Sequence, residues 1–93
     1  MPDLDFIGFS EQYTTKLIKK MKPTLESLPF HEDIVFIRNG YDSSVIKLDN
    51  SEAPFLRIYT RSPERAKILT ESLKEFCDIE IIYIAMFTEK TEK

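Results

Sequence analysis

The chain has 93 residues and a mass of 10.9 kDa, enough for one domain, which we place at residues 1–93. Its net charge of −3 and pI of about 5.1 argue against nucleic-acid binding, which requires clustered basic residues. A single cysteine, Cys77, excludes an internal disulfide and a cysteine metal cluster. No apolar run is long enough to span a membrane, and the first residues lack signal-peptide features, so we expect a cytoplasmic protein.

The first segment predicts a strand followed by a helix. Residues 3–7 alternate, with Leu4 and Phe6 on one face, which is the period of a half-buried strand. Ser10 is a good helix N-cap, and apolar residues then recur every three or four positions up to Leu28. Pro23 interrupts this pattern, so we expect a kink or a break near Lys22.

The middle of the chain predicts three short strands. Ile34–Ile37 is a run of β-branched and aromatic residues, and Asn39-Gly40 marks a tight turn after it. Ser44–Leu48 has the pattern of a shorter, less buried strand, followed by a polar loop. Phe55–Thr60 alternates again, with Leu56 and Ile58 on one face.

The last third predicts a helix, a strand and a tail. Ser62-Pro63-Glu64 combines an N-cap, a proline at the first helical position and an acid in the first turn. An apolar stripe continues the helix to Phe76, and Ile79–Phe87 is the most apolar strand. Residues 88–93 form a polar tail.

The order of these elements contains a repeat. A shift of 52 residues aligns five pairs: Pro2 with Pro54, Leu4 with Leu56, Phe6 with Ile58, Ser10 with Ser62 and Leu17 with Leu69. We therefore expect two β-α-β units, residues 2–48 and 54–87, each with parallel strands joined by a right-handed crossover. The predicted fold is an α+β two-layer sandwich, a four-stranded mixed sheet with both helices on one face. A ferredoxin-like fold is the alternative.

Helices on one face leave the other face of such a sheet uncovered. Ile34–Ile37 and Ile79–Ile84 are apolar on both faces, so an isolated chain exposes aromatic and β-branched surface. We therefore expect a homo-oligomer in which this face packs against neighbouring subunits.

Two stretches resemble the tautomerase superfamily, the group that includes macrophage migration inhibitory factor. The opening Met1-Pro2-Asp3-Leu4-Asp5-Phe6-Ile7-Gly8 is similar to that of a small uncharacterised bacterial branch. Pro54-Phe55-Leu56-Arg57-Ile58, followed by the Arg61–Arg65 segment, matches the central strand and charged helix of the same branch. The resemblance implies a homotrimer with its helices outside, and a cofactor-free, metal-free pocket at the terminal proline near a subunit boundary.

The resemblance also implies a chemistry for Pro2. Removal of Met1 leaves Pro2 with a secondary amine, and burial among apolar groups lowers the pKa of such an amine towards neutrality. A neutral amine is a general base for the keto–enol conversion of a small 2-keto acid. Arg38, Arg57 and Tyr83 lie on predicted strands and could bind the substrate carboxylate or the enolate oxygen.

Other functions remain open at the level of sequence. The alternative to a tautomerase is a non-catalytic module on the same scaffold that binds a small ligand or a protein partner. Then Arg38 is an exposed turn residue, Arg57 a solvated strand residue and Tyr83 a core or interface residue. A metal-dependent nuclease is excluded, because Val45-Ile46-Lys47 has valine where the metal-binding acid must stand.

Overall fold

The computed structural model describes residues 2–37 and 45–84. Within these ranges it contains four strands, two α-helices and one short 3₁₀ helix. In chain order these are β1 (Asp3–Ile7), α1 (Glu11–Glu26), the 3₁₀ helix η1 (His31–Asp33), β2 (Val35–Ile37), β3 (Phe55–Thr60), α2 (Pro63–Leu73) and β4 (Ile79–Tyr83). Neither α-helix in the described ranges is long and apolar enough to cross a membrane.

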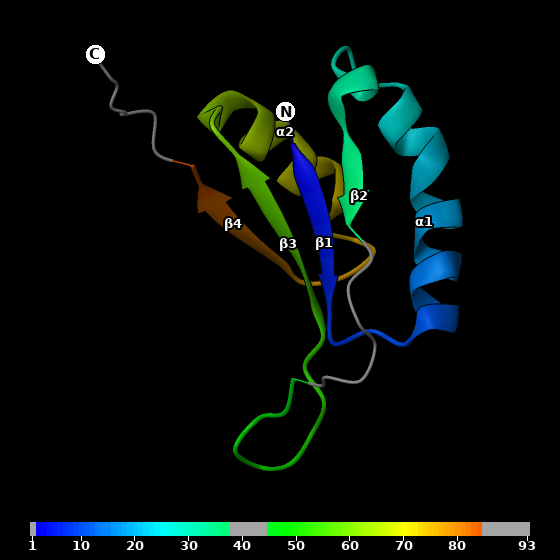
Figure 1. Cartoon of the computed structure of the whole chain (residues 1–93), viewed down its shortest axis with the longest axis vertical. Coiled ribbons are helices and arrows are strands. Elements are labelled where there is room, and N and C mark those ends of the chain that lie inside the picture. Colours follow the sequence, from blue (N-terminus) through cyan, green and yellow to red (C-terminus); the bar gives the residue numbers. More distant parts are fainter. Residues whose placement is uncertain (1, 38–44, 85–93) are drawn as a thin grey trace, which may run out of the picture.

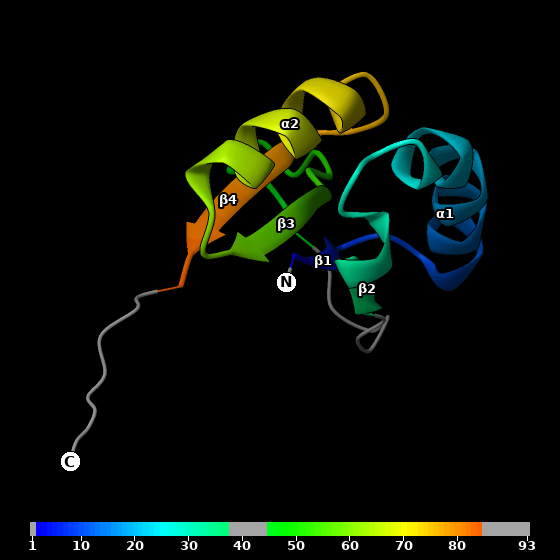
Figure 2. The same ribbon diagram turned by 90° about the horizontal axis from the view of Figure 1, so that it is seen from above.

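The four strands form one mixed sheet in the order β2-β1-β3-β4 (Figure 1). The strands of each β-α-β unit, β1 with β2 and β3 with β4, are parallel, and β1 and β3 pair antiparallel at the centre. Both helices lie on the same face (Figure 2). The predicted α+β architecture is therefore confirmed. The ferredoxin-like alternative is wrong, because that fold separates the strands of each unit, whereas here they are direct neighbours.

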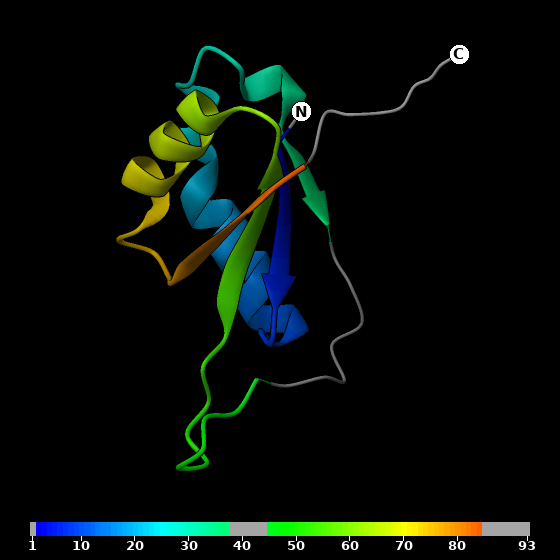
Figure 3. The ribbon, with the colours of Figure 1, turned by 90° about the vertical axis from the view of Figure 1, so that its left-hand side faces the viewer.

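The core lies between the sheet and the helices, and strand alternation builds it. Leu4 and Phe6 of β1 and Leu56 and Ile58 of β3 are buried, and the antiparallel register pairs Leu4 with Ile58 and Phe6 with Leu56. These four side chains belong to one hydrophobic core cluster with buried residues of both helices. Figure 3 shows the two helices on one side of the sheet. Burial of large apolar side chains on one face fixes the register, since a slip of one residue would expose them all.

Helix α1 runs without a break through Pro23. Of the two outcomes expected near Lys22, a kink or a break, the break is therefore wrong. Pro23 is exposed, whereas Met21 and Leu25 beside it are buried in the core. Proline removes one backbone hydrogen bond from a helix. Here the apolar face of the helix stays packed, and this tertiary packing holds the residues on either side in helical conformation.

The predicted strand Ser44–Leu48 is reduced to an isolated bridge between Ile46 and Glu52. It belongs to a hairpin over residues 45–53, which we call the arm and which projects beyond the end of the sheet (Figure 1). Ser44, Arg38 and the predicted turn Asn39-Gly40 lie outside the described residues, as does the end of the predicted strand Ile79–Phe87.

The sheet face turned away from the helices, which we call the open face, carries a mixture of apolar and charged side chains. Val35 and Ile82 are exposed on it, as expected for a sheet covered on one side. By the strand registers its members are Asp3, Asp5, Ile7, Val35, Ile37, Phe55, Arg57, Tyr59, Glu80 and Ile82.

Candidate functional site

Pro2 lies at the start of the central strand β1, and its side chain is less than 2% exposed. Its carbonyl accepts a hydrogen bond of 3.0 Å from the N–H of Val35, which ties it to β2. Asp3 pairs with Tyr59, so Pro2 lies level with the next residue of β3, Thr60. The proline is therefore held between two strands at one end of the sheet.

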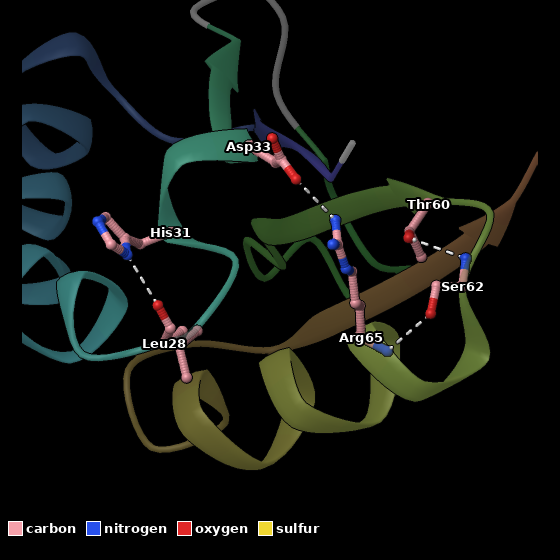
Figure 4. Close-up of polar contacts among 6 residues, drawn as sticks. All are labelled: Leu28, His31, Asp33, Thr60, Ser62 and Arg65. Atoms are coloured by element: carbon pink, nitrogen blue, oxygen red, sulfur yellow. Dashed lines mark hydrogen bonds and ion pairs between the residues drawn. The ribbon is translucent and has the colours of Figure 1, made fainter.

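The same end of the sheet carries an arginine. The Nη1 atom of Arg65, on the first turn of α2, lies 3.2 Å from Oδ2 of Asp33 in η1 (Figure 4). The guanidinium also lies over the ring of Phe30, 4.7 Å from its centroid. A carboxylate and an aromatic face thus hold this cation in place.

Two hydroxyl groups fix the start of α2. The hydroxyl of Ser62 accepts a hydrogen bond of 3.1 Å from the N–H of Arg65, and the hydroxyl of buried Thr60 accepts one of 3.1 Å from the N–H of Ser62 (Figure 4). These bonds connect the end of β3 to the first turn of the helix. They therefore fix the backbone of Arg65 relative to the sheet. We refer to Pro2, Asp33, Thr60, Ser62 and Arg65 together as the Pro2 corner.

Arg57, predicted to bind substrate, lies elsewhere. It occupies the middle of β3 on the open face, where its Nε donates a 2.5 Å hydrogen bond to Glu80. This bond raises the pKa of the guanidinium. Arg57 precedes Thr60 by three residues, a separation of about 10 Å along the strand. A single chain therefore does not bring Arg57 to Pro2.

The other two predicted site residues have different outcomes. Tyr83 pairs with Thr60 across β3 and β4, so it lies at the same end of the sheet as Pro2, and its side chain is 57% exposed. Because β3 lies between β4 and β1, Tyr83 lies at the edge of the Pro2 corner and not next to Pro2. Arg38 lies outside the described residues.

Arg65 and Asp33 were not singled out from the sequence. Arg65 could have been found, because the capping signal Ser62-Pro63-Glu64 places it on the first turn of a helix that directly follows a central strand. Asp33 gave no such signal, since it meets Arg65 only through the tertiary fold. In the described ranges no group of three or more histidine, cysteine or acidic side chains could hold a metal ion.

A groove of about 570 Å³ opens at the other end of the sheet. Aromatic side chains and two carboxylates, Glu52 and Asp78, contribute to its walls. Burial raises the pKa of the Cys77 thiol to about 11, and the negative charge of Asp78 adds to this effect. The residues around the groove are Gly8, Phe9, Ser10, Tyr13, Glu52, Pro54, Phe76, Cys77 and Asp78.

No protein-family model and no curated protein matches this chain. Two solved structures resemble it. A domain of unknown function (DUF1904) from Sebaldella termitidis ATCC 33386 is 18% identical, with 96% of this chain and 95% of that one covered and a TM-score of 0.48. A protein of unknown function from Vibrio cholerae O1 biovar eltor str. N16961 is 13% identical, with 98% and 84% covered and a TM-score of 0.46. Likenesses this low assign neither a family nor an activity to this chain.

Proposed function

We propose that this protein is a cofactor-free tautomerase of the macrophage migration inhibitory factor type, acting on a small 2-keto acid. The observation that carries the proposal is the position of Pro2, which is buried at the start of a central strand in a corner that also contains an arginine. Removal of Met1 would give Pro2 a secondary amine. An amine in an apolar site loses hydration of its charged form, which lowers its pKa and makes it a base near neutral pH.

In this mechanism the Pro2 nitrogen takes a proton from the carbon next to the substrate carbonyl. The electron pair of that C–H bond forms a C=C bond to the carbonyl carbon, while the π pair of the carbonyl moves to the oxygen and gives the enolate. The protonated amine then returns the proton to the oxygen, so no redox group is needed. An enolate oxygen needs hydrogen-bond donors as its charge develops. The Tyr83 hydroxyl, at the rim of the corner, is our candidate for this role.

Arg65 is our candidate for binding the substrate carboxylate. Its guanidinium is partly exposed, and its present partner, Asp33, is more than half exposed. A carboxylate on the substrate can therefore replace Asp33 as a partner at small cost, because an exposed ion pair contributes at most about 1 kcal/mol. A guanidinium also offers two parallel donors to one carboxylate, which orients the substrate.

We further propose that the protein assembles as a homotrimer through its open face. Val35 and Ile82 are exposed there and Phe55 is partly exposed, so association would remove apolar surface from water. The helices would then lie outside and the sheets would face the centre. The Pro2 end of the sheet would lie near a subunit boundary, where a neighbouring subunit would complete a substrate pocket.

The test combines native mass spectrometry with a proton-exchange assay. Native mass spectrometry of the untagged protein is expected to show a trimer whose subunits lack Met1. In D₂O, the protein should catalyse the exchange of the C3 protons of 2-oxobutanoate for deuterium. The loss of the C3 proton signal in ¹H NMR spectra measures this exchange.

The matched control inserts one alanine between Met1 and Pro2, which keeps the proline ring but converts its nitrogen into an amide. This variant should retain the assembly and lose the exchange activity. Equal activity in the two proteins, or retention of Met1 in the unmodified one, would contradict the proposal.

A second candidate function, a non-catalytic assembly module, is favoured by the arm. Ile46 is 56% exposed, and Leu48 near the tip is fully exposed although backbone hydrogen bonds hold the hairpin in shape. Exposed apolar side chains on an ordered hairpin would suit a contact with a protein partner. A Leu48→Asp variant that binds fewer copurifying partners but exchanges 2-oxobutanoate normally would separate the two functions.

A further inference from the structure

The two helices begin in the same way but meet different surroundings. In each helix, the backbone N–H of the third residue after the capping serine donates a hydrogen bond of 3.1 Å to the serine hydroxyl. Tyr13 donates to Ser10, and Arg65 donates to Ser62. Tyr13 and Arg65 therefore occupy equivalent positions in the two β-α-β units. Each lies near the segment that joins the helix of the other unit to its second strand, because Arg65 pairs with Asp33 and Tyr13 shares the groove with Asp78.

At the Arg65 end, a cation fills the space between a carboxylate and a ring. The guanidinium lies 3.2 Å from Asp33 and 4.7 Å from the centroid of Phe30. At the Tyr13 end, none of the nine described residues around the groove is a lysine, arginine or histidine. Tyr13 instead stacks on Phe9, with 5.6 Å between the ring centroids, and the residue remains 48% exposed.

Among the described residues, the groove therefore has carboxylates and aromatic rings but no basic side chain. Glu52 and Asp78 are both exposed at the groove, and within residues 2–37 and 45–84 neither is paired with a basic side chain. The rings of Tyr13, Phe9 and Phe76 provide aromatic surface beside them. A volume of about 570 Å³ accommodates a small organic molecule.

We propose that this groove binds an organic cation, an amidinium, guanidinium or ammonium group on an apolar body, which takes the place that Arg65 holds in the other unit. The charged group would bond to the carboxylates of Glu52 and Asp78, and the apolar body would lie on the aromatic wall. This site is at the opposite end of the sheet from Pro2, so it does not depend on the proposed tautomerase activity.

An anion is a poorer fit to the same groove. The start of α1 lies there, and helix N-termini attract anions. However, the N–H of Tyr13 already donates its hydrogen bond to the Ser10 hydroxyl. In addition, the carboxylates of Glu52 and Asp78 would repel a negative ligand. Burial raises the pKa of the Cys77 thiol, so this group stays neutral and offers an anion no charge partner. The charges that line the groove therefore favour a cation.

The test is a titration of the ¹⁵N-labelled full chain with benzamidine, which joins an amidinium to an apolar ring. We expect saturable shifts of the backbone N–H signals of Gly8, Tyr13 and Cys77. Benzamide, the neutral analogue, and benzoate, the anionic one, should give no saturable shift. Benzoate binding in the groove would overturn the proposal in favour of an anion site, and equal binding of benzamide would show that charge is not recognised.

Three substitutions locate the site. Asp78→Asn and Glu52→Gln should each weaken benzamidine binding by roughly fivefold, the scale of one exposed charge pair. Glu71→Gln is the matched control, because Glu71 pairs with Lys74 on the exposed side of α2 and does not line the groove. Unchanged affinity in both groove variants, or no saturable shift up to about 10 mM benzamidine, would refute the proposal.

A fourth substitution supplies the cation from within the chain. Tyr13→Arg places a guanidinium at the position equivalent to Arg65, where it should pair with Asp78 and abolish benzamidine binding in a folded protein. Full binding by this folded variant would contradict the equivalence on which the proposal rests.

Discussion

Ser10 and Ser62 cap the two helices with the same geometry. Each hydroxyl accepts a hydrogen bond of 3.1 Å from the backbone N–H three residues later, and each serine has an extended backbone. Each serine also follows a central strand of the antiparallel pair β1 and β3. The two helices therefore leave the centre of the sheet from equivalent points, which is why both cover the same face.

Loss of either cap should destabilise the protein. Ser10→Ala and Ser62→Ala are each expected to lower the free energy of unfolding by about 1 kcal/mol, because an N–H at the helix start loses its partner. Urea denaturation measures this change. The controls are Ser10→Asp and Ser62→Asp, which keep an acceptor at the cap and should retain most of the stability. An equal loss in the alanine and aspartate variants would show that the cap bond is not responsible.

Replacing Thr14 with valine should increase the stability of the protein. The Thr14 hydroxyl is fully buried on α1 and has no hydrogen-bond partner among the residues that the structure describes. Thr14→Val replaces this hydroxyl with a methyl group of similar shape, so it should raise the free energy of unfolding by about 1 kcal/mol. Thr14→Ser, which keeps the hydroxyl and removes the methyl group, should lower it. A destabilised valine variant would mean that the hydroxyl has a partner.

The strands and helices that bury one face could be predicted from the sequence. Leu4 and Phe6 alternate with polar residues, and Ser62-Pro63 marks the start of α2, so local patterns define these elements. The continuity of α1 through Pro23 could not be predicted in this way. Local rules expect an interruption there. The helix continues because Met21 and Leu25 pack against a core that the local sequence does not show.

The candidate site was less predictable than the fold. Pro2 was identified through a resemblance, and the sheet does place it at the start of a central strand. Arg57 was chosen because it lies on a strand, but alternation alone does not say which face is open, and the fold puts it opposite Glu80. The pairing of Arg65 with Asp33 joins residues 32 positions apart. Only the order of the strands brings them together.

Gly8 should not tolerate a side chain. Its φ of +83° is unfavourable for residues with a Cβ atom, and an added Cβ would lie 3.1 Å from Cγ2 of Val45 and 3.3 Å from Cα of Pro54. Gly8→Ala should therefore cost about 1–2 kcal/mol of unfolding free energy, measured by urea denaturation. Gly8→Ala with Val45→Ala removes one contact but not the backbone strain, so stability should recover only in part. Full recovery would show that φ is not limiting.

Cys77 should react slowly with alkylating reagents. Burial raises the pKa of its thiol to about 11, so the reactive thiolate is scarce at pH 8. A pKa about two units above the usual value lowers the thiolate fraction roughly a hundredfold. A thiolate whose thiol has a higher pKa is also more nucleophilic, and this recovers roughly a factor of ten. Iodoacetamide should therefore react roughly tenfold more slowly with the folded protein than with the urea-unfolded chain, and the folded rate should still rise between pH 8 and pH 10. Equal rates in the two states would contradict the raised pKa.

Arg65 and Arg57 provide the sharpest test of the proposed tautomerase site, because each is a strand or helix arginine in one partly exposed ion pair. Arg65→Gln should lower kcat/KM for exchange of 2-oxobutanoate protons by roughly tenfold to a hundredfold, mainly through KM, since it removes a charge-assisted bond to the substrate carboxylate. Arg57→Gln, on the open face, should leave kcat/KM within about twofold in protein that native mass spectrometry shows to be still trimeric.

Within one subunit both ion pairs are partly exposed, so each substitution should change the free energy of unfolding of the subunit by less than about 1 kcal/mol. Differences in activity then cannot come from unfolding. Arg65→Lys keeps the charge but not the two parallel donors of a guanidinium, so its KM should lie between those of the unmodified protein and Arg65→Gln. If Arg57→Gln instead lost the activity and Arg65→Gln kept it, the substrate would bind at the open face, and the Pro2 corner would not be the site of proton transfer.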